Sequence, residues 1–282
     1  MLSKAPSAVL RDIIWVFNSP SLIAEDYFEV EDFQLSFETT ESNVKLVANH
    51  LKNNPLTEIH QRRLGFYFEY LFEAGITLFS NHKVVVKNFR LPNQHNLGEL
   101  DFITQSQATK QFYHWEIAVK FYLGRGNLSR LENWVGPSKH DTFQKKWKKL
   151  LQKQLPFSNM PEVKHSLLER GITISQNLLF VKGMLFYNLQ SGNANYPGVV
   201  NPAHEKGIWL TPSQFLSYFD RDFDFRILPK NDWLTAYTLK PELDILKMRE
   251  TLQNPPLRPI MFSFYKLGSY LGKGFLVPEG YL

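Results

Sequence analysis

The sequence contains no cysteine among its 282 residues. Disulfide bonds, thiol catalysis and cysteine-ligated zinc are therefore excluded together. No apolar run approaches the roughly 20 residues that cross a bilayer, and Arg11 and Asp12 interrupt the apolar N-terminal stretch. We therefore expect a cytoplasmic protein that has no membrane partner.

Several catalytic motifs are also missing. The chain has no G-x-S-x-G element and no H-E-x-x-H element, and its histidines are scattered. The segment GSYLGKG at 268–274 is not a phosphate-binding loop, because only three residues separate Gly268 from Gly272 and Gly274 follows Lys273. These absences disfavour an α/β-hydrolase, a P-loop protein and a histidine-based zinc site.

The composition is that of a folded chain with a sizeable core, since 43% of the residues are hydrophobic and 15% aromatic. Strand-like and helix-like segments are mixed along it. We therefore predict an α/β (α+β) fold with a mixed central sheet flanked by helices. We divide the chain into a mainly helical scaffold segment at 1–60, a core at 61–190 and a C-terminal α/β extension at 191–282.

Charge is distributed unevenly over these segments. Residues 1–60 hold 4 Lys and Arg against 9 Asp and Glu, whereas residues 61–190 hold 18 against 9. The core segment therefore has a net charge of +9. A surface of this sign attracts phosphate backbones.

Two neighbouring predicted strands contain the charged residues from which a function can be predicted. Residues 97–104 and 112–123 are rich in aromatic and β-branched residues, and the segment between them suits a hairpin connection. Because side chains alternate along a strand, Glu99 and Asp101 share one face of the first strand.

The second strand repeats this alternation. Glu116, Ala118 and Lys120 lie on one face, opposite an apolar face. If the charged faces of the two strands coincide, three carboxylates and one ammonium group meet in a patch the size of a metal site. His114 shares this face, and we interpret it as a partly buried structural histidine rather than a ligand.

Two helices flank the strands in the sequence. The first is predicted over residues 57–74, with Gly75 as its stop, and Glu69 lies on its flank as either a group facing the sheet or a solvated charge. The second is predicted over residues 138–155, and its apolar stripe includes Gln154, which points inward. The outer face of the second helix is basic, with Lys145, Lys146, Lys148, Lys149 and Lys153.

At these residues the chain resembles the PD-(D/E)XK nuclease superfamily, in which one strand carries an Asp and the next an acidic-x-Lys element. Asp101 matches the Asp, and Lys120 matches the closing Lys. The resemblance implies Glu69 as a further acid from the preceding helix and Gln154 as a polar residue from the following one. It also implies a restriction-endonuclease-like core.

A closer resemblance is to a bacterial family described as a domain of unknown function, DUF1853, which is placed within that superfamily. It rests on WEIAVKFYLG and the following GPSKHDTFQKKWKKLLQKQL. It extends from RDIIWVFNSPSL near the N-terminus to GFLVPEGYL at the end.

One position departs from the superfamily pattern. Two residues before Lys120 stands Ala118, and the nearest carboxylate, Glu116, is four residues before it. Four strand residues span about 13 Å, against about 7 Å for two. A bulge would draw Glu116 in, or Glu99 or Glu69 would replace it as a ligand. Otherwise the site is inactive.

The resemblance implies Mg²⁺- or Mn²⁺-dependent hydrolysis of phosphodiester bonds in nucleic acid, with DNA preferred. Asp101, with one or two of Glu116, Glu99 and Glu69, is expected to hold the metal. Lys120 is expected to position the attacking water or to stabilise charge in the transition state.

Basic side chains near the strands are the expected contacts to phosphate, although a solvated surface explains them equally well. They are Arg125, Arg130, Lys145, Lys146 and Lys149. Two other interpretations stay open. One is a nuclease fold without catalysis that binds nucleic acid, and the other is a protein-interaction scaffold whose acidic N-terminal third docks onto a basic surface.

Overall fold

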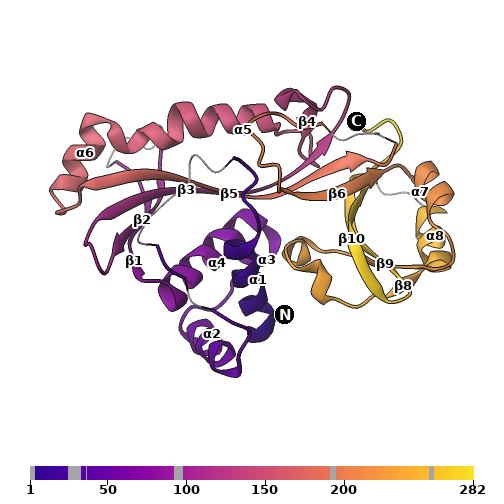
Figure 1. The fold of residues 1–282 in the computed structure, drawn as a ribbon, viewed down its shortest axis with the longest axis horizontal. Coiled ribbons are helices and arrows are strands. Elements are labelled where there is room, and N and C mark those ends of the chain that lie inside the picture. The colour runs from indigo at the N-terminus through magenta and orange to yellow at the C-terminus, as the bar shows by residue number, and fades with distance from the viewer. Residues whose placement is uncertain (1–3, 25–32, 36, 92–97, 191–194, 254–256) are drawn as a thin grey trace. The chain divides into compact units, whose positions relative to one another are not determined.

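The computed structural model has a mixed α/β fold, in which a large mixed sheet is flanked by helices, as the sequence predicts (Figure 1). It describes residues 4–24, 33–35, 37–91, 98–190, 195–253 and 257–282. Residue 97, the predicted start of one strand, lies outside them. Within these ranges no helix has the length and apolar character that a membrane span requires.

The chain divides into two compact units, each built from two separate segments. The first unit consists of Met1–Val119 and Lys145–Lys182, and the second of Lys120–Gln144 and Gly183–Leu282. Strands β3 (Phe112–Gly124) and β5 (Ile174–Asn188) begin in the first unit and end in the second. The division at residues 60 and 190 stays a prediction.

The strands of the first unit follow the order β1, β2, β3, β5. Strand β1 (His82–Phe89) pairs antiparallel with β2 (Leu100–Ser106), which pairs antiparallel with β3. The predicted pairing of the two central strands is thereby confirmed. Their register places Phe102 opposite Trp115.

Helices cover both faces of this part of the sheet (Figure 1). On one face lie α1 (Pro6–Asn18), α2 (Glu41–Asn53), α3 (Glu58–Arg62) and α4 (Leu64–Phe79). On the other lie α5 (Phe143–Lys149) and α6 (Pro161–Leu168).

The helix predicted over residues 57–74 is two helices, α3 and α4, and Gly75 does not stop the second of them. Gly75 instead permits close packing, because a Cβ atom there would lie 2.1 Å from Cε2 of Phe17. α4 continues for four residues beyond this contact and ends at Phe79.

The predicted helix over residues 138–155 is also different. It begins at Phe143, and after Lys149 it widens into the π-helical turn η3 (Leu150–Gln154), followed by the 3₁₀ turn η4 (Leu155–Asn159). A π-helical turn changes which side chains share a helix face and is common at functional sites.

The apolar face of β2 and β3 packs against α4. The ring of Phe72 lies 5.1 Å from that of Phe102 and 5.6 Å from that of Trp115. Glu116, the neighbour of Trp115 on β3, therefore points to the opposite face, where it contacts Gln154 of η3. A second cluster of the first unit consists of Phe89, Leu91, Leu100, Ile103, Phe157, Val163, Leu167 and Ile172.

The second unit continues from β5 in the order β6, β10, β9, β7, β8. Strand β6 is parallel to both β5 and β10, and the pairs further along are antiparallel, so the sheet is mixed. The strands are β4 (Trp134–Val135, paired with β3), β6 (Glu205–Leu210), β7 (Phe223–Ile227), β8 (Leu243–Asp244), β9 (Ile260–Lys266) and β10 (Ser269–Leu276).

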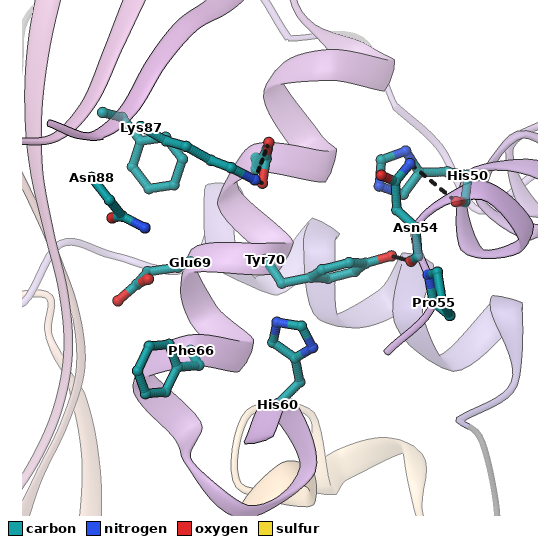
Figure 2. Close-up of a pocket in the computed structure, with 11 residues that line it drawn as sticks. His50, Asn54, Pro55, His60, Phe66, Glu69, Tyr70, Lys87 and Asn88 are labelled. Carbon is teal, nitrogen blue, oxygen red and sulfur yellow. Dashed lines mark hydrogen bonds and ion pairs between the residues drawn. The ribbon is translucent and has the colours of Figure 1, made fainter. Parts of the chain in front are cut away.

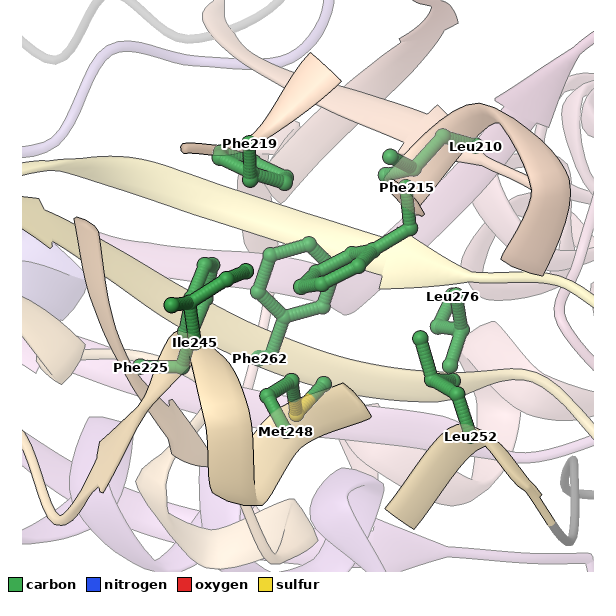
Figure 3. Close-up of a cluster of buried hydrophobic side chains, with 9 residues drawn as sticks. All are labelled: Leu210, Phe215, Phe219, Phe225, Ile245, Met248, Leu252, Phe262 and Leu276. Carbon is green, nitrogen blue, oxygen red and sulfur yellow. The ribbon is translucent and has the colours of Figure 1, made fainter. Parts of the chain in front are cut away.

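Two helices, α7 (Pro212–Tyr218) and α8 (Ile245–Gln253), complete the second unit. Helix α7 begins directly after Thr211, whose hydroxyl accepts a hydrogen bond from the backbone N–H of Gln214 and which a proline follows. Both helices cover an aromatic-rich core (Figure 3), formed by Leu210, Phe215, Phe219, Phe225, Ile245, Met248, Leu252, Phe262 and Leu276.

Candidate functional site

Asp101 and Glu116 are cross-strand neighbours in the first unit. The pairing of β2 with β3 ends at Phe102 and Trp115, and Asp101 and Glu116 are the residues directly beyond this last pair. Alternation along the strands puts their side chains on the same face, and the charge of Glu116 acts on Asp101. The backbone N–H of Ile117 donates to Oδ2 of Asp101 at 2.9 Å. The Glu116 side chain is 0% exposed. Pairing of the strands therefore brings together two carboxylates that the sequence places 15 residues apart.

Both oxygens of Glu116 are held by hydrogen bonds. Its Oε1 lies 3.0 Å from Nε2 of His114, and its Oε2 accepts from Nε2 of Gln154 at 2.6 Å. The ammonium of Lys146 donates to Oε1 of Gln154 at 3.0 Å. Gln154, which belongs to η3, thus links the buried carboxylate to a lysine on α5 and fixes the orientation of both.

A second set of partners holds His114, which is fully buried. Its Nδ1 lies 3.0 Å from Oδ1 of Asn177 on β5, and the hydroxyl of Ser158 donates to the same oxygen at 2.7 Å. Asn177 and Ser158 were not predicted as site residues. They lie far from the central strands in the sequence and belong to no motif. Asn177 could have been noticed only as a polar residue directly before an apolar run.

The pKa of the Asp101 carboxyl is raised to about 8, first by burial and then by the negative charge of Glu116. The Ile117 N–H and the Lys146 ammonium lower it, but less. The two carboxylates are therefore incompletely neutralised by their own surroundings. Added positive charge at this position would stabilise the ionised form of Asp101.

A cavity of about 880 Å³, which we name the carboxylate cavity, opens beside Asp101. Its lining combines acids with bases, and it consists of Phe66, Glu69, Asn88, Arg90, Gly98, Glu99, Asp101, Lys149, Lys153 and Gln154. The presence of three basic side chains around carboxylates suits a ligand that carries both phosphate and a metal ion.

The other predicted acids lie in the same cavity. Burial raises the pKa of Glu69, and the charge of Glu99 raises it further. Glu99 accepts a hydrogen bond from Nε of Arg90 at 2.6 Å. Glu69 also has a weak raising effect on the pKa of Asp101, so it belongs to the same electrostatic environment.

Lys120 lies on β3 in the second unit, where its ammonium forms an ion pair with Asp141 at 2.6 Å. The hydroxyl of Tyr122 donates to the same carboxylate at 3.4 Å. Asp141 was not predicted as a partner. Of the two arginines predicted to contact phosphate, Arg130 donates to Glu132 at 2.6 Å and Arg125 is exposed; both are in the second unit.

The three predicted phosphate-binding lysines of α5 lie in different environments. Lys145 and Lys149 are exposed, and Lys149 lines the carboxylate cavity. Lys146 is half-buried and turns toward Gln154, whereas the helical wheel puts it on the outer face. The difference arises because η3 shifts Gln154 relative to α5.

The donors at this site suit a hard divalent cation. Among the described residues, no three His, Asp or Glu side chains are grouped so that they could hold a metal ion together. The candidate ligands are therefore the two neighbouring carboxylates, Asp101 and Glu116. Mg²⁺ commonly binds through one or two carboxylates and keeps several waters. Two adjacent carboxylates, one of which has its pKa raised by burial and then by the charge of the other, fit this requirement.

Comparison with known proteins gives one match. The family described as "Domain of unknown function (DUF1853)" matches residues 11–258. No curated protein and no solved structure matches the chain. The matched range includes Glu116 and all the residues that line the carboxylate cavity, Asp101 among them.

Proposed function

The chain belongs to the DUF1853 family, and we propose that it is a divalent-metal-dependent nuclease that hydrolyses phosphodiester bonds of DNA. The observation that carries this proposal is the carboxylate of Asp101, which lines a cavity with a basic rim and is coupled electrostatically to the buried carboxylate of Glu116. We also propose that the first unit has a restriction-endonuclease-like core within the PD-(D/E)XK superfamily.

Each residue of the pair has a defined part in this proposal. Asp101 and Glu116 hold Mg²⁺ or Mn²⁺, and Gln154 keeps Glu116 in place through its 2.6 Å hydrogen bond. When bound, the metal supplies Lewis-acid stabilisation of phosphoryl charge and lowers the pKa of a coordinated water. Lys149, Lys153 and Arg90 bind the phosphate backbone.

Two lysines are candidates for the ammonium group of the reaction. Lys120 matches the family pattern, and it is paired with Asp141. Lys146 has contacts that favour it, because it donates to Gln154 and lowers the pKa of Asp101. We therefore assign charge stabilisation near the pair to Lys146 and test Lys120 separately, with Lys146→Met and Lys120→Met measured side by side.

The decisive experiment compares Asp101→Asn and Glu116→Gln with the exposed control Glu162→Gln. Metal ligands contribute several kcal/mol to catalysis, so each of the first two variants should reduce the rate of DNA cleavage by about 10³-fold or more. The control should cleave at the wild-type rate. Mn²⁺ should raise the unfolding temperature of the wild type and the control but not of Asp101→Asn.

Wild-type protein that cuts no form of DNA or RNA with Mg²⁺ or Mn²⁺ would contradict the proposal. The position of Ala118 favours a second candidate, a nuclease fold that binds nucleic acid without cutting it. In that case salt-sensitive binding persists in Asp101→Asn and does not require metal.

A further inference from the structure

A second cavity of the first unit, of about 290 Å³, adjoins the carboxylate cavity, and we name it the Tyr70 cavity. The two cavities share Phe66, Glu69 and Asn88 as lining residues. Figure 2 shows these three at one end of the Tyr70 cavity and His50 and Asn54 at the other. A ligand bound in the carboxylate cavity therefore has a side recess beside it.

Apart from Glu69 at its junction with the carboxylate cavity, the recess has little net charge. Its one ammonium, on Lys87, is paired with Glu73 at 2.9 Å. Burial lowers the pKa of both His50 and His60, so the two imidazoles are neutral at pH 7. The Tyr70 hydroxyl is also neutral, with a pKa raised to about 12, and donates to the backbone oxygen of Asn54. Such a lining suits an uncharged ring better than a phosphate.

The polar groups of the recess can form hydrogen bonds with the edge of a heterocyclic base. The backbone N–H of Thr57 donates to Nδ1 of His60 at 3.0 Å, so the neutral ring carries its hydrogen on Nε2 and has a donor left. Asn88 offers both an amide donor and an acceptor at the junction of the cavities. Its backbone φ of 52° lies in the left-handed region, which few residues other than glycine adopt.

Phe66 adds an aromatic surface at the same junction. It is 37% exposed on the first turns of α4, although most aromatic residues of this helix are buried. The guanidinium of Arg63 lies 5.9 Å from its ring. Exposed aromatic rings beside a basic groove are the usual stacking platforms for unpaired bases. A cavity of about 150 Å³ already admits benzene, so the volume of the recess is sufficient for a base.

We propose that the Tyr70 cavity receives one unstacked base of single-stranded nucleic acid, with Phe66 as its stacking platform, while the adjoining phosphate lies beside Asp101. This inference rests on the proposed nuclease function and makes it more specific. A base inside a duplex is stacked and paired, and it reaches such a recess only after it leaves the helix. The preferred substrate is therefore single-stranded.

The test measures binding in EDTA, so that no cleavage occurs. The probes are a labelled single strand of about 12 nucleotides, the duplex of the same sequence, and a single strand of the same length that lacks bases. Stacking is worth about 1–3 kcal/mol per base, so Phe66→Ala should weaken binding of the normal single strand by about 5- to 150-fold. It should leave binding of the abasic strand and the duplex unchanged.

Three further variants make the result specific. Phe66→Trp should retain single-strand affinity within about threefold, and Leu46→Ala, which removes an equally exposed apolar side chain elsewhere on the first unit, should have no effect. Asn88→Gly keeps the left-handed backbone but removes the amide. It should weaken binding of the normal strand by about 2- to 10-fold and should also give a readout if Phe66→Ala does not fold.

Equal affinity of the wild type for the normal and abasic strands would overturn the assignment of the recess. So would a loss of affinity in Phe66→Ala that is the same for both strands. A parallel assay of wild-type cleavage with Mn²⁺ separates the two proposals. Cleavage without base-dependent binding refutes only the recess, and base-dependent binding without cleavage refutes only the nuclease.

Discussion

The two units bury opposite kinds of side chain beside their parts of the sheet. In the first unit a carboxylate and a histidine, Glu116 and His114, are both fully buried and are connected by hydrogen bonds to Gln154 and Asn177. In the second unit the buried cluster is apolar and includes four phenylalanines, Phe215, Phe219, Phe225 and Phe262.

The two kinds of side chain differ in their free energy of burial. Burial of a phenylalanine contributes about 1.5–3 kcal/mol to folding, whereas burial of a charge is unfavourable unless partners compensate for it. The polar cluster of the first unit therefore stabilises less than an apolar one of the same size would. The phenylalanine cluster is explained by stability, whereas the polar cluster is accounted for by the function that we propose for it.

The largest expected effect on stability comes from the phenylalanine cluster. Phe262→Ala should lower the free energy of unfolding by about 3–5 kcal/mol, because the side chain is 0% exposed and leaves a cavity. The control Leu257→Ala, at a side chain that is 91% exposed, should change it by less than about 0.5 kcal/mol. Urea unfolding measures both. DNA cleavage per folded molecule should stay at the wild-type level. A loss of cleavage as large as that of Asp101→Asn would contradict the assignment of the phenylalanine cluster to stability alone.

A smaller effect is expected within the polar cluster. Asn177→Ala removes the partner of both Ser158 and His114, and buried polar groups without partners cost about 1–3 kcal/mol. The exposed Asn159→Ala is the control. Because His114 orients Glu116, cleavage should fall while single-strand binding is retained. Unchanged cleavage alongside reduced stability would make this network structural only.

Stability is also expected to depend on pH. The pKa of Asp101 is raised from 3.8 to about 8, so between these values the folded state binds a proton that the unfolded state has released. Stability therefore falls as pH rises through this window, by at most about 1.4 kcal/mol per pH unit. Subtracting the unfolding free energy of Asp101→Asn from that of wild type at pH 6, 7 and 8 isolates this contribution. A difference that stays constant or grows would show that Asp101 is ionised throughout.

Alternation along strands made part of the site predictable. It put Asp101 and Glu116 on the same face, and in the structure they lie directly beyond the last β2–β3 pair and interact electrostatically. A helical wheel also indicated that Gln154 points inward, and its hydrogen bond to Glu116 accords with this. These predictions depend only on local periodicity, which the sequence carries directly.

Contacts that depend on irregular backbone or on distant segments were not predictable in this way. The π-helical turn after Lys149 shifts Gln154 relative to α5 and brings it within hydrogen-bond distance of Lys146, which the helical wheel puts on the outer face. Gly75 was expected to stop its helix, but it accommodates the ring of Phe17 instead. Asn177 reaches His114 across 63 residues, and no spacing rule connects them.

The separation between His114 and Asn177 has a consequence for synthesis of the protein. Ribosomes add about 5–20 residues per second, so about 3–13 seconds pass between the emergence of His114 and that of its partner on β5. During this interval the carboxylate of Glu116 on β3 remains hydrated, because its burial before its hydrogen-bond network is complete would be unfavourable. The hydrogen-bond network around Glu116 therefore forms only after most of the first unit has left the ribosome.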